Sequence, residues 1–511
     1  MPNRLAVLGL LLLALPLAGQ TGRDSAVHLL NRAAWGPRPG DVERVASTGV
    51  AAWIDAQLAP RRLDDRATDR ALERYGVLSQ SPDELLVLFQ DNQRANRERQ
   101  AMGDSGMMMP APGDRPVTGI RRANLELQQA TVARAILSER QLYEVLVDVW
   151  TNHFNVFLGK GPNRALVADY IATAIRPNAV GRFEDLLLAA GRHPAMLIYL
   201  DNAQSVAEGA EPPRPPGRRG QRPLPRQMPS GINENYAREL LELHTVGVDA
   251  GYTQDDVVAV ARILTGWSLD PRGRTRFQFH AWAHDRDAKV VMGRAFPEGR
   301  GEDEGVALLR WLANHPSTMR HVSARLCARF VADDPPDGCV DAGVRAWERS
   351  NGQITDVVRA ILMSPEFWAP EHRASKIKSP FEFVVSAARA LGAVPDTSLA
   401  LPQMLQRLGQ PLYLYSPPTG YPERMESWVS SSALFDRFNL AVALASGRAP
   451  GLTVNLTSLG NLESIAQQVL PGGMSAATRA AITQETADLP PAQARMMMVG
   501  LALGSPEFQR Q

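Results

Sequence analysis

The stretch Asn233-Glu-Asn-Tyr-Ala-Arg-Glu-Leu-Leu-Glu-Leu-His-Thr245 combines helical spacing of apolar residues with many polar ones. On a helix that turns about 100° per residue, Asn235, Glu239 and Glu242 form one narrow stripe, with Arg238 beside it. Because apolar residues border the stripe on both sides, we expect it to face the interior. Carboxylates and guanidinium groups are seldom buried unless they are paired or coordinate a ligand. The stretch therefore predicts a helix that carries a polar site inside the fold.

The rest of the chain has a helical pattern almost throughout. The segments 138–153 and 253–266 each begin with a capping-box pattern and continue with apolar residues on one helical face. Strand-like alternation is scarce, and the best candidate for extended structure is 276–291. These patterns predict a mainly α protein, a large multi-helix globular array with little or no β-sheet.

Two stretches interrupt the helical pattern. Residues 101–118 are rich in Met, Gly, Pro and Asp, and residues 207–230 contain many Pro and Arg. Such compositions cannot hold a helix, so we interpret both stretches as exposed, Pro- and Gly-rich loops. Otherwise residues 21–511 form one α-helical region, with candidate subdivisions near 295–300 and 395–400.

The N-terminal residues resemble a secretory signal. Arg4 precedes an apolar run from Leu5 to Ala18, and small residues follow. We interpret 1–20 as a signal peptide, the alternative being an uncleaved anchor. Since no later stretch approaches about 18 consecutive apolar residues, we expect no transmembrane segment after signal removal. The mature protein is then exported, to the periplasm or outside the cell.

The net charge bears on the class of partner, and the cysteine content bears on disulfide formation. The 511 residues carry a formal net charge of +1, which argues against a nucleic-acid partner because such proteins usually show a basic excess. The two cysteines, Cys327 and Cys339, bracket a segment with a Pro-Pro-Asp-Gly turn. They form either a small-loop disulfide or two buried thiols, and the sequence leaves both alternatives open.

Several blocks of the chain resemble the bacterial domain of unknown function 1800 family. The similarity begins with the stretch 233–245 and runs from about residue 25 to the end. It includes the blocks His28–Gly36, Trp150–Phe154, Ala195–Asn202, Gly251–Val257, Ala261–Trp267, His284–Asp285 with Lys289 and Gly293, and Leu408–Pro411. Gly420-Tyr421-Pro422 departs from the Gly-Trp-Pro of the family, and its hydroxyl puts any tight contact there in doubt. The resemblance implies export and no established activity. It also implies a candidate partner from a second uncharacterised, sulfatase-like family, whose genes often neighbour those of this one.

The first group of candidate site residues consists of metal ligands. Glu239 and Glu242 lie three residues apart, as do carboxylates that bridge metals in helical bundles, although they could also pair with Arg238. His153 shares a helical face with apolar residues and should point inward, as a ligand, a base or a satisfied core histidine. We therefore assign His153, Glu239 and Glu242 to a divalent or transition metal, while the cofactor itself stays unknown. Asn152 lies on a different face and could anchor a loop.

The second group contains catalytic and substrate-binding candidates. A neighbouring carboxylate can hold a histidine in one tautomer, so His284, Asp285 and Arg238 are the catalytic candidates. A loop stabilised by a His-Asp pair explains His284 and Asp285 equally well. We assign Asn235, Lys289 and Asn202 to substrate binding. His244 is expected to be turned away by its spacing and to cap the end of its helix.

These residues lead to two hypotheses of different class. The sequence contains no Gly-x-Ser-x-Gly elbow, phosphate-binding loop or dinucleotide fingerprint. We predict convergence of His153, Asn235, Arg238, Glu239, Glu242, His284 and Asp285. If they converge, a metal-assisted enzyme, hydrolytic or oxidative, is the leading interpretation. The alternative is a non-catalytic binding or assembly factor for the sulfatase-like partner, in which the polar motif fixes helix register.

Overall fold

The fold is mainly α, as the sequence predicts. The computed structural model describes residues 22–103, 117, 119–213, 231–457 and 459–511. These residues form helices α1 to α24, several 3₁₀ and π turns, and six short strands. The predicted signal peptide and most of the predicted loops 101–118 and 207–230 lie outside the described residues. The first loop boundary was wrong, since helix α5 (Pro82–Gly103) continues to residue 103.

The helices divide along the chain into an N-terminal and central set and a C-terminal set. The first set comprises α1 (Gly22–Ala33), α2 (Asp41–Thr48), α3 (Val50–Gln57), α4 (Arg66–Leu72), α5, α6 (Gly119–Leu137), α7 (Gln141–His153), α8 (Asn163–Asp169), α9 (Phe183–Arg192), α10 (Pro194–Tyr199), α11 (Glu234–Glu239) and α12 (Gln254–Ile263). The second comprises α13 (Glu302–Ala313), α14 (Pro316–Phe330), α15 (Asp337–Ser350), α16 (Ile354–Leu362), α17 (Pro365–Trp368), α18 (Pro380–Ala390), α19 (Leu401–Arg407), α20 (Ser431–Ala445), α21 (Leu462–Val469), α22 (Ala476–Thr486), α23 (Pro491–Gly504) and α24 (Pro506–Gln509).

The strands form three separate antiparallel ribbons of two strands each. They pair β1 (Trp267–Leu269) with β2 (Phe277–Phe279), β3 (Lys289–Val291) with β4 (Arg294–Phe296), and β5 (Val394–Pro395) with β6 (Leu452–Thr453). Both β2 and β3 fall inside the predicted extended segment 276–291.

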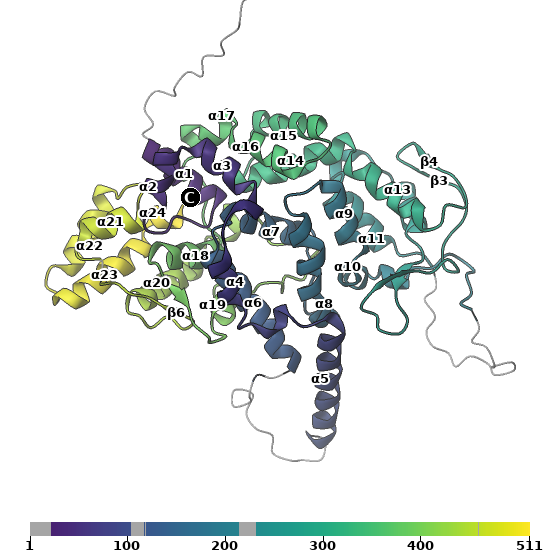
Figure 1. The fold of residues 1–511 in the computed structure, drawn as a ribbon, viewed down its shortest axis with the longest axis horizontal. Coiled ribbons are helices and arrows are strands. Elements are labelled where there is room, and N and C mark those ends of the chain that lie inside the picture. Colours follow the sequence, from purple (N-terminus) through teal and green to yellow (C-terminus); the bar gives the residue numbers. More distant parts are fainter. Residues whose placement is uncertain (1–21, 104–116, 118, 214–230, 458) are drawn as a thin grey trace, which may run out of the picture.

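The helices pack around a core that spans the chain. Buried apolar residues from Ala26 in α1 to Phe508 in α24 form one contiguous cluster. Figure 1 shows α6, α7 and α18 in the middle of the molecule, with α20 to α24 on one side and α9 to α13 on the other. The predicted subdivisions near 295–300 and 395–400 stay predictions.

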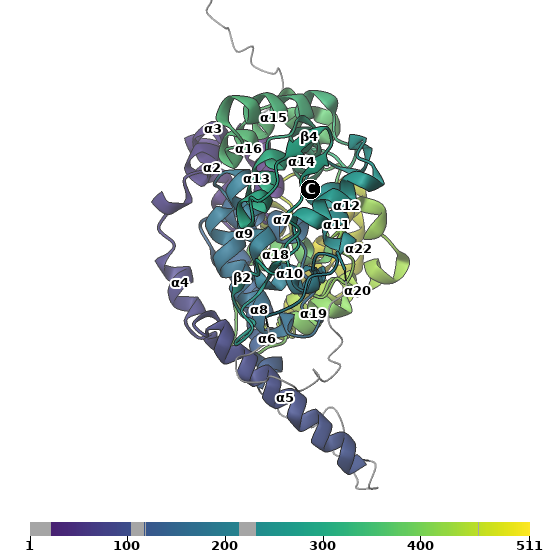
Figure 2. The same ribbon diagram turned by 90° about the vertical axis from the view of Figure 1, so that its right-hand side faces the viewer.

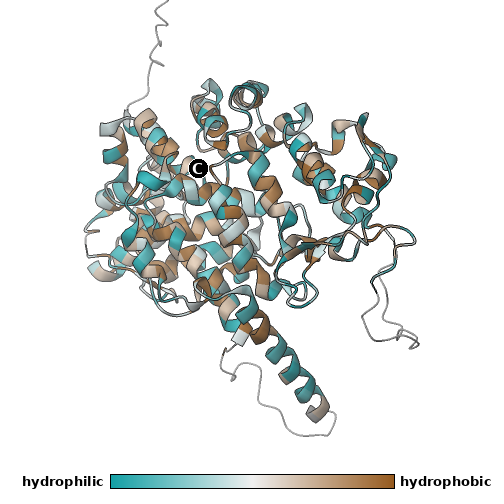
Figure 3. Cartoon of the chain, turned by 45° about the vertical axis from the view of Figure 1, so that its right-hand side comes forward, coloured by the Kyte–Doolittle hydropathy of each residue, from teal (hydrophilic) through white to brown (hydrophobic). Residues whose placement is uncertain are grey.

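Helix α5 departs from this compact arrangement. Its first half packs against α6 and α8, and its second half extends away from the body (Figure 2). The hydropathy colouring agrees, since the protruding turns of α5 are largely hydrophilic while the central helices show alternating polar and apolar faces (Figure 3). A polar helix end needs no apolar partner to cover it.

Local start signals give mixed results. The capping box at Thr253 and Asp256 forms and begins α12. The box predicted at 138–141 does not form, because Ser138 Oγ instead donates to Asp65 and α7 begins at Gln141 itself. Cys327 in α14 and Cys339 in α15 form a disulfide, which settles the alternative left open by the sequence. No helix among the described residues is long and apolar enough to cross a membrane.

Candidate functional site

The predicted polar stripe lies on the surface, which corrects the expectation that it faces the interior. Asn235 is exposed, and Arg238, Glu239 and Glu242 are only partly buried. The helix buries a wide apolar arc on its other side, made by Tyr236, Ala237, Leu240 and Leu241. Arg238 interacts with Glu234 (Nη2 to Oε2, 3.6 Å) and donates to Gln254, so it does not pair with the two predicted carboxylates.

The helix also changes its pitch within the motif. Residues Leu240–His244 form a π turn, so the 100° projection fails after Glu239. His244 is consequently buried rather than turned away, and packs against His153 and Phe154. Burial lowers its pKa to about 3, so it is neutral and cannot cap the helix as a cation.

His153 points inward, as predicted, but into an aromatic environment. Its Nε2 lies 3.1 Å from the backbone oxygen of His244, and its ring packs against Phe154 and Phe183. Burial lowers the pKa of His153 well below the usual range. His153 is therefore placed as a core histidine, and it does not join Glu239 and Glu242 in a metal site.

His284, Asp285 and Lys289 do come together, in a buried ionic network. Lys289 Nζ lies 2.8 Å from Glu304 Oε2, and the same oxygen lies 3.3 Å from His284 Nε2. Asp285 pairs with Arg262 at 2.6 Å; burial acts to raise its pKa, but the hydrogen bonds from Arg262 hold the pKa below the usual range. Lys289 and Arg262 bind the carboxylates of Glu304 and Asp285, so this network fastens β3 to α12 and α13, while the second oxygen of Glu304 has no hydrogen-bond partner among the described residues.

The remaining predicted residue, Asn202, is fully buried. Its amide donates to the backbone oxygens of Leu264 and Trp267, both at 3.1 Å, so it anchors a chain turn. The seven residues expected to converge therefore occupy three separate places. No group of three or more His, Cys, Asp and Glu side chains in the described part of the chain is arranged to hold a metal ion.

Two adjoining cavities lie elsewhere, on either side of Asp148 in α7. The smaller cavity, about 60 Å³ and here named the polar chamber, is lined by charged and hydrogen-bonding side chains. The larger, about 390 Å³ and here named the large chamber, has mostly apolar and aromatic walls. Asp148, Thr151, Leu412 and Tyr413 line both chambers. None of the nine residues assigned from the sequence lines either one.

The polar chamber is built where α7 meets the loop that precedes α20. Asn152 accepts from the backbone N–H of Tyr421 and donates to its backbone oxygen, at 2.7 and 2.9 Å. This confirms that Asn152 anchors a loop. Gly420 has a φ of 71°, and a Cβ there would lie 2.3 Å from the backbone oxygen of Asn152, so only glycine allows this approach.

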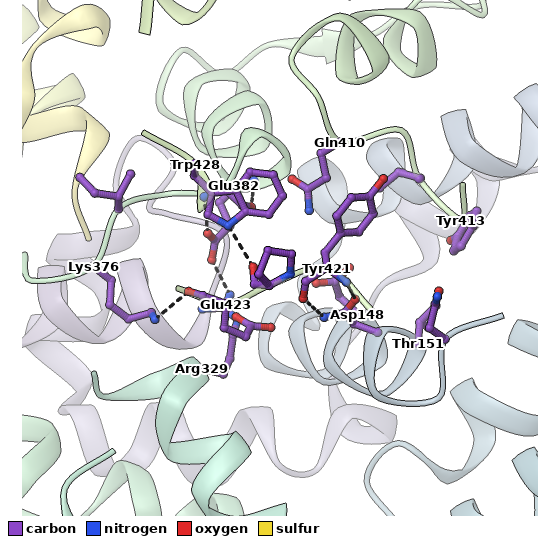
Figure 4. A pocket seen from close by; sticks show the side chains of 16 residues that line it. Asp148, Thr151, Arg329, Lys376, Glu382, Gln410, Tyr413, Tyr421, Glu423 and Trp428 are labelled. Atoms are coloured by element: carbon purple, nitrogen blue, oxygen red, sulfur yellow. Dashed lines mark hydrogen bonds and ion pairs between the residues drawn. The ribbon is translucent and has the colours of Figure 1, made fainter. Parts of the chain in front are cut away.

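Tyr421 is the residue that departs from the family pattern, and its hydroxyl is satisfied. The hydroxyl donates to the backbone oxygen of Pro411 at 2.7 Å, and the ring packs against Tyr415 and Trp428. The extra oxygen therefore ties two family blocks together and causes no unpaired contact. Figure 4 shows Tyr421 between Asp148 on one side and Glu382 with Trp428 on the other.

The opposite wall of the polar chamber carries Arg329, Lys376 and Glu382, and Figure 4 shows Arg329 bound to Glu382. Arg329 Nη2 lies 2.9 Å from Glu382 Oε1, and Lys376 pairs with Asp333. Glu382 also accepts from the backbone of Ser379. Burial acts to raise the pKa of Glu382, but Arg329 and these hydrogen bonds hold it below the usual range. Arg329, Lys376 and Glu382 thus each have a partner of opposite charge.

Asp148 differs from these paired groups. Its carboxyl group makes no hydrogen bond or ion pair with any described residue, and the residue is half-buried. Burial raises its pKa to about 7; Arg329 opposes the rise, and Glu423 and Glu382 add to it. Near neutral pH this carboxyl group can therefore either give or accept a proton.

The large chamber contains a second group without a partner. Arg134 in α6 lines it, and its guanidinium group forms no hydrogen bond or ion pair within the described ranges. Burial lowers the pKa of Arg134, and nearby Arg176 lowers it further; Arg176 itself is paired with Glu144 at 2.7 Å. Tyr413, between the chambers, has a φ of 61°, an uncommon conformation for a residue with a side chain.

Sequence reasoning missed these residues, although a signal existed. Asp148 is the one acidic residue in the apolar middle of α7, and it shares a helical face with Thr151 and Asn152. Three blocks of family-like sequence contribute to the polar chamber, but nothing local in them indicates that they meet: Trp150–Phe154, Leu408–Pro411 and Gly420–Pro422. Their contact depends on long-range packing between α7 and the loop that follows α19.

The comparisons with known proteins agree with the extent of the sequence similarity. No curated protein and no solved structure matches the chain. The family model described as "Protein of unknown function (DUF1800)" matches residues 28–510, nearly the whole chain. The chain therefore belongs to the DUF1800 family.

Proposed function

We propose that this protein is an exported enzyme that binds a small acidic molecule in the large chamber and transfers a proton through Asp148. One observation carries the proposal: a half-buried carboxyl group without a partner among the described residues lies at the junction of two cavities. Burying such a group costs free energy that folding alone does not require. Ionisable groups with strongly shifted pKa values in clefts are typical of functional sites.

The chemistry follows from the neighbours of Asp148. A general acid or base works best when its pKa lies near the working pH, and burial brings the pKa of Asp148 to about 7. Arg329 is engaged by Glu382, so it does not neutralise Asp148 by direct pairing. Arg134 supplies a positive charge inside the large chamber, where it would orient an anionic group of the ligand.

Two predictions from the sequence bear on this proposal: export of the protein and assistance by a metal ion. Export is supported by the Cys327–Cys339 disulfide, since disulfides persist in oxidising compartments. A role for a metal ion stays a prediction. We assign no metal ligands, because the predicted ligands His153, Glu239 and Glu242 do not form a cluster. Elemental analysis of the native protein and of Glu239→Ala tests that prediction separately.

The proposed enzyme is tested with a defined mixture of small organic acids. Wild type, Asp148→Asn and Glu239→Gln are incubated with the mixture, and consumption is followed by mass spectrometry. We expect wild type and Glu239→Gln to consume the same acid and Asp148→Asn to leave it intact. Equal consumption by Asp148→Asn contradicts the proposal. So does a wild-type protein that neither consumes any of the acids nor is stabilised by them against heat.

A second candidate function is favoured by the exposure of the polar stripe. Asn235 is exposed, and Glu239 and Glu242 are half-buried, so the stripe presents polar groups on the surface, as a docking surface for a partner protein would. The candidate partner is the exported, sulfatase-like protein implied by the family resemblance. Co-purification of the two proteins with wild type, and its loss with Glu239→Ala plus Glu242→Ala, would support this function. Retained co-purification with the double variant would contradict a role for the stripe.

A further inference from the structure

Lysine is rare in this chain, and the four lysines do not have the same environment. Of the 55 basic Lys and Arg residues, only Lys160, Lys289, Lys376 and Lys378 are lysines. Three of them are paired. Lys160 binds Asp201, Lys289 binds Glu304, and Lys376 binds Asp333. The amine of Lys378 makes no hydrogen bond or ion pair with the described residues.

Lys378 is held in place but left open to a cavity. Its backbone N–H donates to the backbone oxygen of Gln509, and only 4% of the residue is exposed. Its Nζ lies 3.9 Å from the centre of the Phe508 ring. A cavity of about 450 Å³ lies beside it, between α1, the segment before α18, the chain after α21 and the C-terminal residues. This cavity is separate from the polar chamber, which is lined by the neighbouring Lys376 and Ser379.

The charged surroundings of Lys378 are mixed. Burial lowers its pKa to about 7; Glu382 opposes this, and Arg437 adds to it. The ionisable groups that line the cavity with it are Asp24, His28, Arg373, Glu507 and Arg510. Glu507 is already engaged by Ser475 and Thr478. Near neutral pH a substantial fraction of Lys378 therefore carries a free electron pair, which an ordinary surface lysine does not.

We propose that Lys378 is a reactive amine that forms an imine with a small, acidic aldehyde or oxo acid entering this cavity. The Nζ electron pair attacks the carbonyl carbon, and a C–N bond forms. The nitrogen then loses its two protons as the carbonyl oxygen leaves as water, which gives a C=N double bond. The step is reversible and involves no oxidation or reduction.

Two arginines give the site its preference for an acid. Arg373 and Arg510 line the cavity, and neither makes a side-chain hydrogen bond or ion pair within the described segments. Their guanidinium groups are suited to bind a carboxylate bidentately while the carbonyl meets Lys378. This inference does not rest on the role proposed for Asp148, since the two groups line different cavities.

The test uses glyoxylate with sodium cyanoborohydride, which reduces any imine to a stable amine. The full chain is treated over a range of pH, digested, and mapped by mass spectrometry at the four lysines. We expect the Lys378 adduct to form at least about tenfold faster than the Lys160 adduct at pH 7, with a half-maximal rate near pH 7. An unmodified Lys378, or one modified no faster than Lys160, overturns the proposal.

Matched variants separate reactivity from folding. Lys376→Arg changes a buried but paired lysine two residues away and should keep the adduct at Lys378. Lys378→Arg should remove it while the other adducts stay unchanged. The wild-type map alone decides the proposal if a variant fails to fold. Arg373→Gln should slow the reaction with glyoxylate but not with acetaldehyde; equal slowing of both overturns the preference for an acid.

Discussion

The α11 motif and the middle of α7 carry polar residues in opposite situations. The motif has four polar side chains in one stripe, and the stripe lies at the surface with its charges partly in water. Helix α7 has Glu144 in its first turn, paired with Arg176, and one carboxyl group in its apolar middle, at Asp148; that group is half-buried between two cavities and has no partner among the described residues. A dense cluster of polar residues is therefore weaker evidence for a buried site than one acidic residue placed where the pattern demands an apolar one.

The largest expected effect separates the two regions by activity. Asp148→Asn removes the proton-transferring group and should reduce turnover of the acid by about 10²- to 10⁴-fold. Glu239→Gln, the matched change in the stripe, should alter turnover by less than about threefold, because water already screens that group. Steady-state rates of both variants test the contrast. Similar losses in the two variants would show that the stripe takes part in the reaction as much as Asp148 does.

A second effect concerns binding in the large chamber. Arg134→Gln removes the unpaired guanidinium and should weaken binding of an acidic ligand by about 10- to 100-fold, since a hydrogen bond to a charged group contributes about 1.5–3 kcal/mol. Calorimetric titration of the acid and of its methyl ester measures the effect. The ester should bind wild type and variant alike. If Arg134→Gln leaves the affinity for the acid unchanged, the guanidinium of Arg134 does not bind the ligand's carboxylate.

A third effect concerns the contact between α7 and its loop. Gly420→Ala forces a Cβ against Asn152 and should destabilise the protein by about 2–3 kcal/mol. Gly409→Ala also changes a glycine with positive φ, but a Cβ there meets nothing within 4 Å, so about 1 kcal/mol is expected from backbone strain alone. Denaturant unfolding of both variants gives the difference. Equal losses would contradict the close packing of Gly420 on Asn152.

The smallest effect lies in the stripe itself. Burial and the neighbouring Glu242 raise the pKa of Glu239, while Arg238 opposes the rise. A raised folded-state pKa means that the contribution of Glu239 to stability is fully present at low pH and is lost as pH rises through that pKa. Glu242→Gln should relieve the repulsion and add a few tenths of a kcal/mol at pH 7, and nothing below about pH 4. Thermal unfolding at the two pH values measures this, and a gain at low pH would contradict it.

The sequence predicted the fold class, the extended segment and the anchoring role of Asn152, because these follow from periodicity and from which helical face a residue occupies. The burial of the motif could not be predicted in the same way. A polar stripe bordered by apolar residues on both sides can face either the core or the solvent. In this fold the helix faces the core with Tyr236, Ala237, Leu240 and Leu241, and the stripe faces the solvent. The π turn at Leu240–His244 then reversed the expectation for His244.

The candidate site escaped prediction for a different reason. Asp148 and Tyr421 are 273 positions apart, and nothing local in either segment indicates that they line one chamber. The ion pair of Arg329 with Glu382, which leaves Asp148 alone, likewise exists only after α14 and α18 have packed. Cavities result from long-range packing. The sequence therefore contains the residues that line them but does not show that these residues lie close together.

The protonation state of Asp148 at neutral pH decides whether this residue can transfer a proton. Infrared difference spectra of wild type minus Asp148→Asn, recorded from pH 4 to pH 9, isolate the C=O stretch of this one carboxylic acid. The unpaired carboxyl group, enclosed between α7 and the chamber walls, predicts that the band persists well above pH 4 and disappears with a midpoint of about 7. A midpoint near 4, the value of an aspartate in water, would contradict the account, because Asp148 would then be ionised at neutral pH and unable to act as an acid.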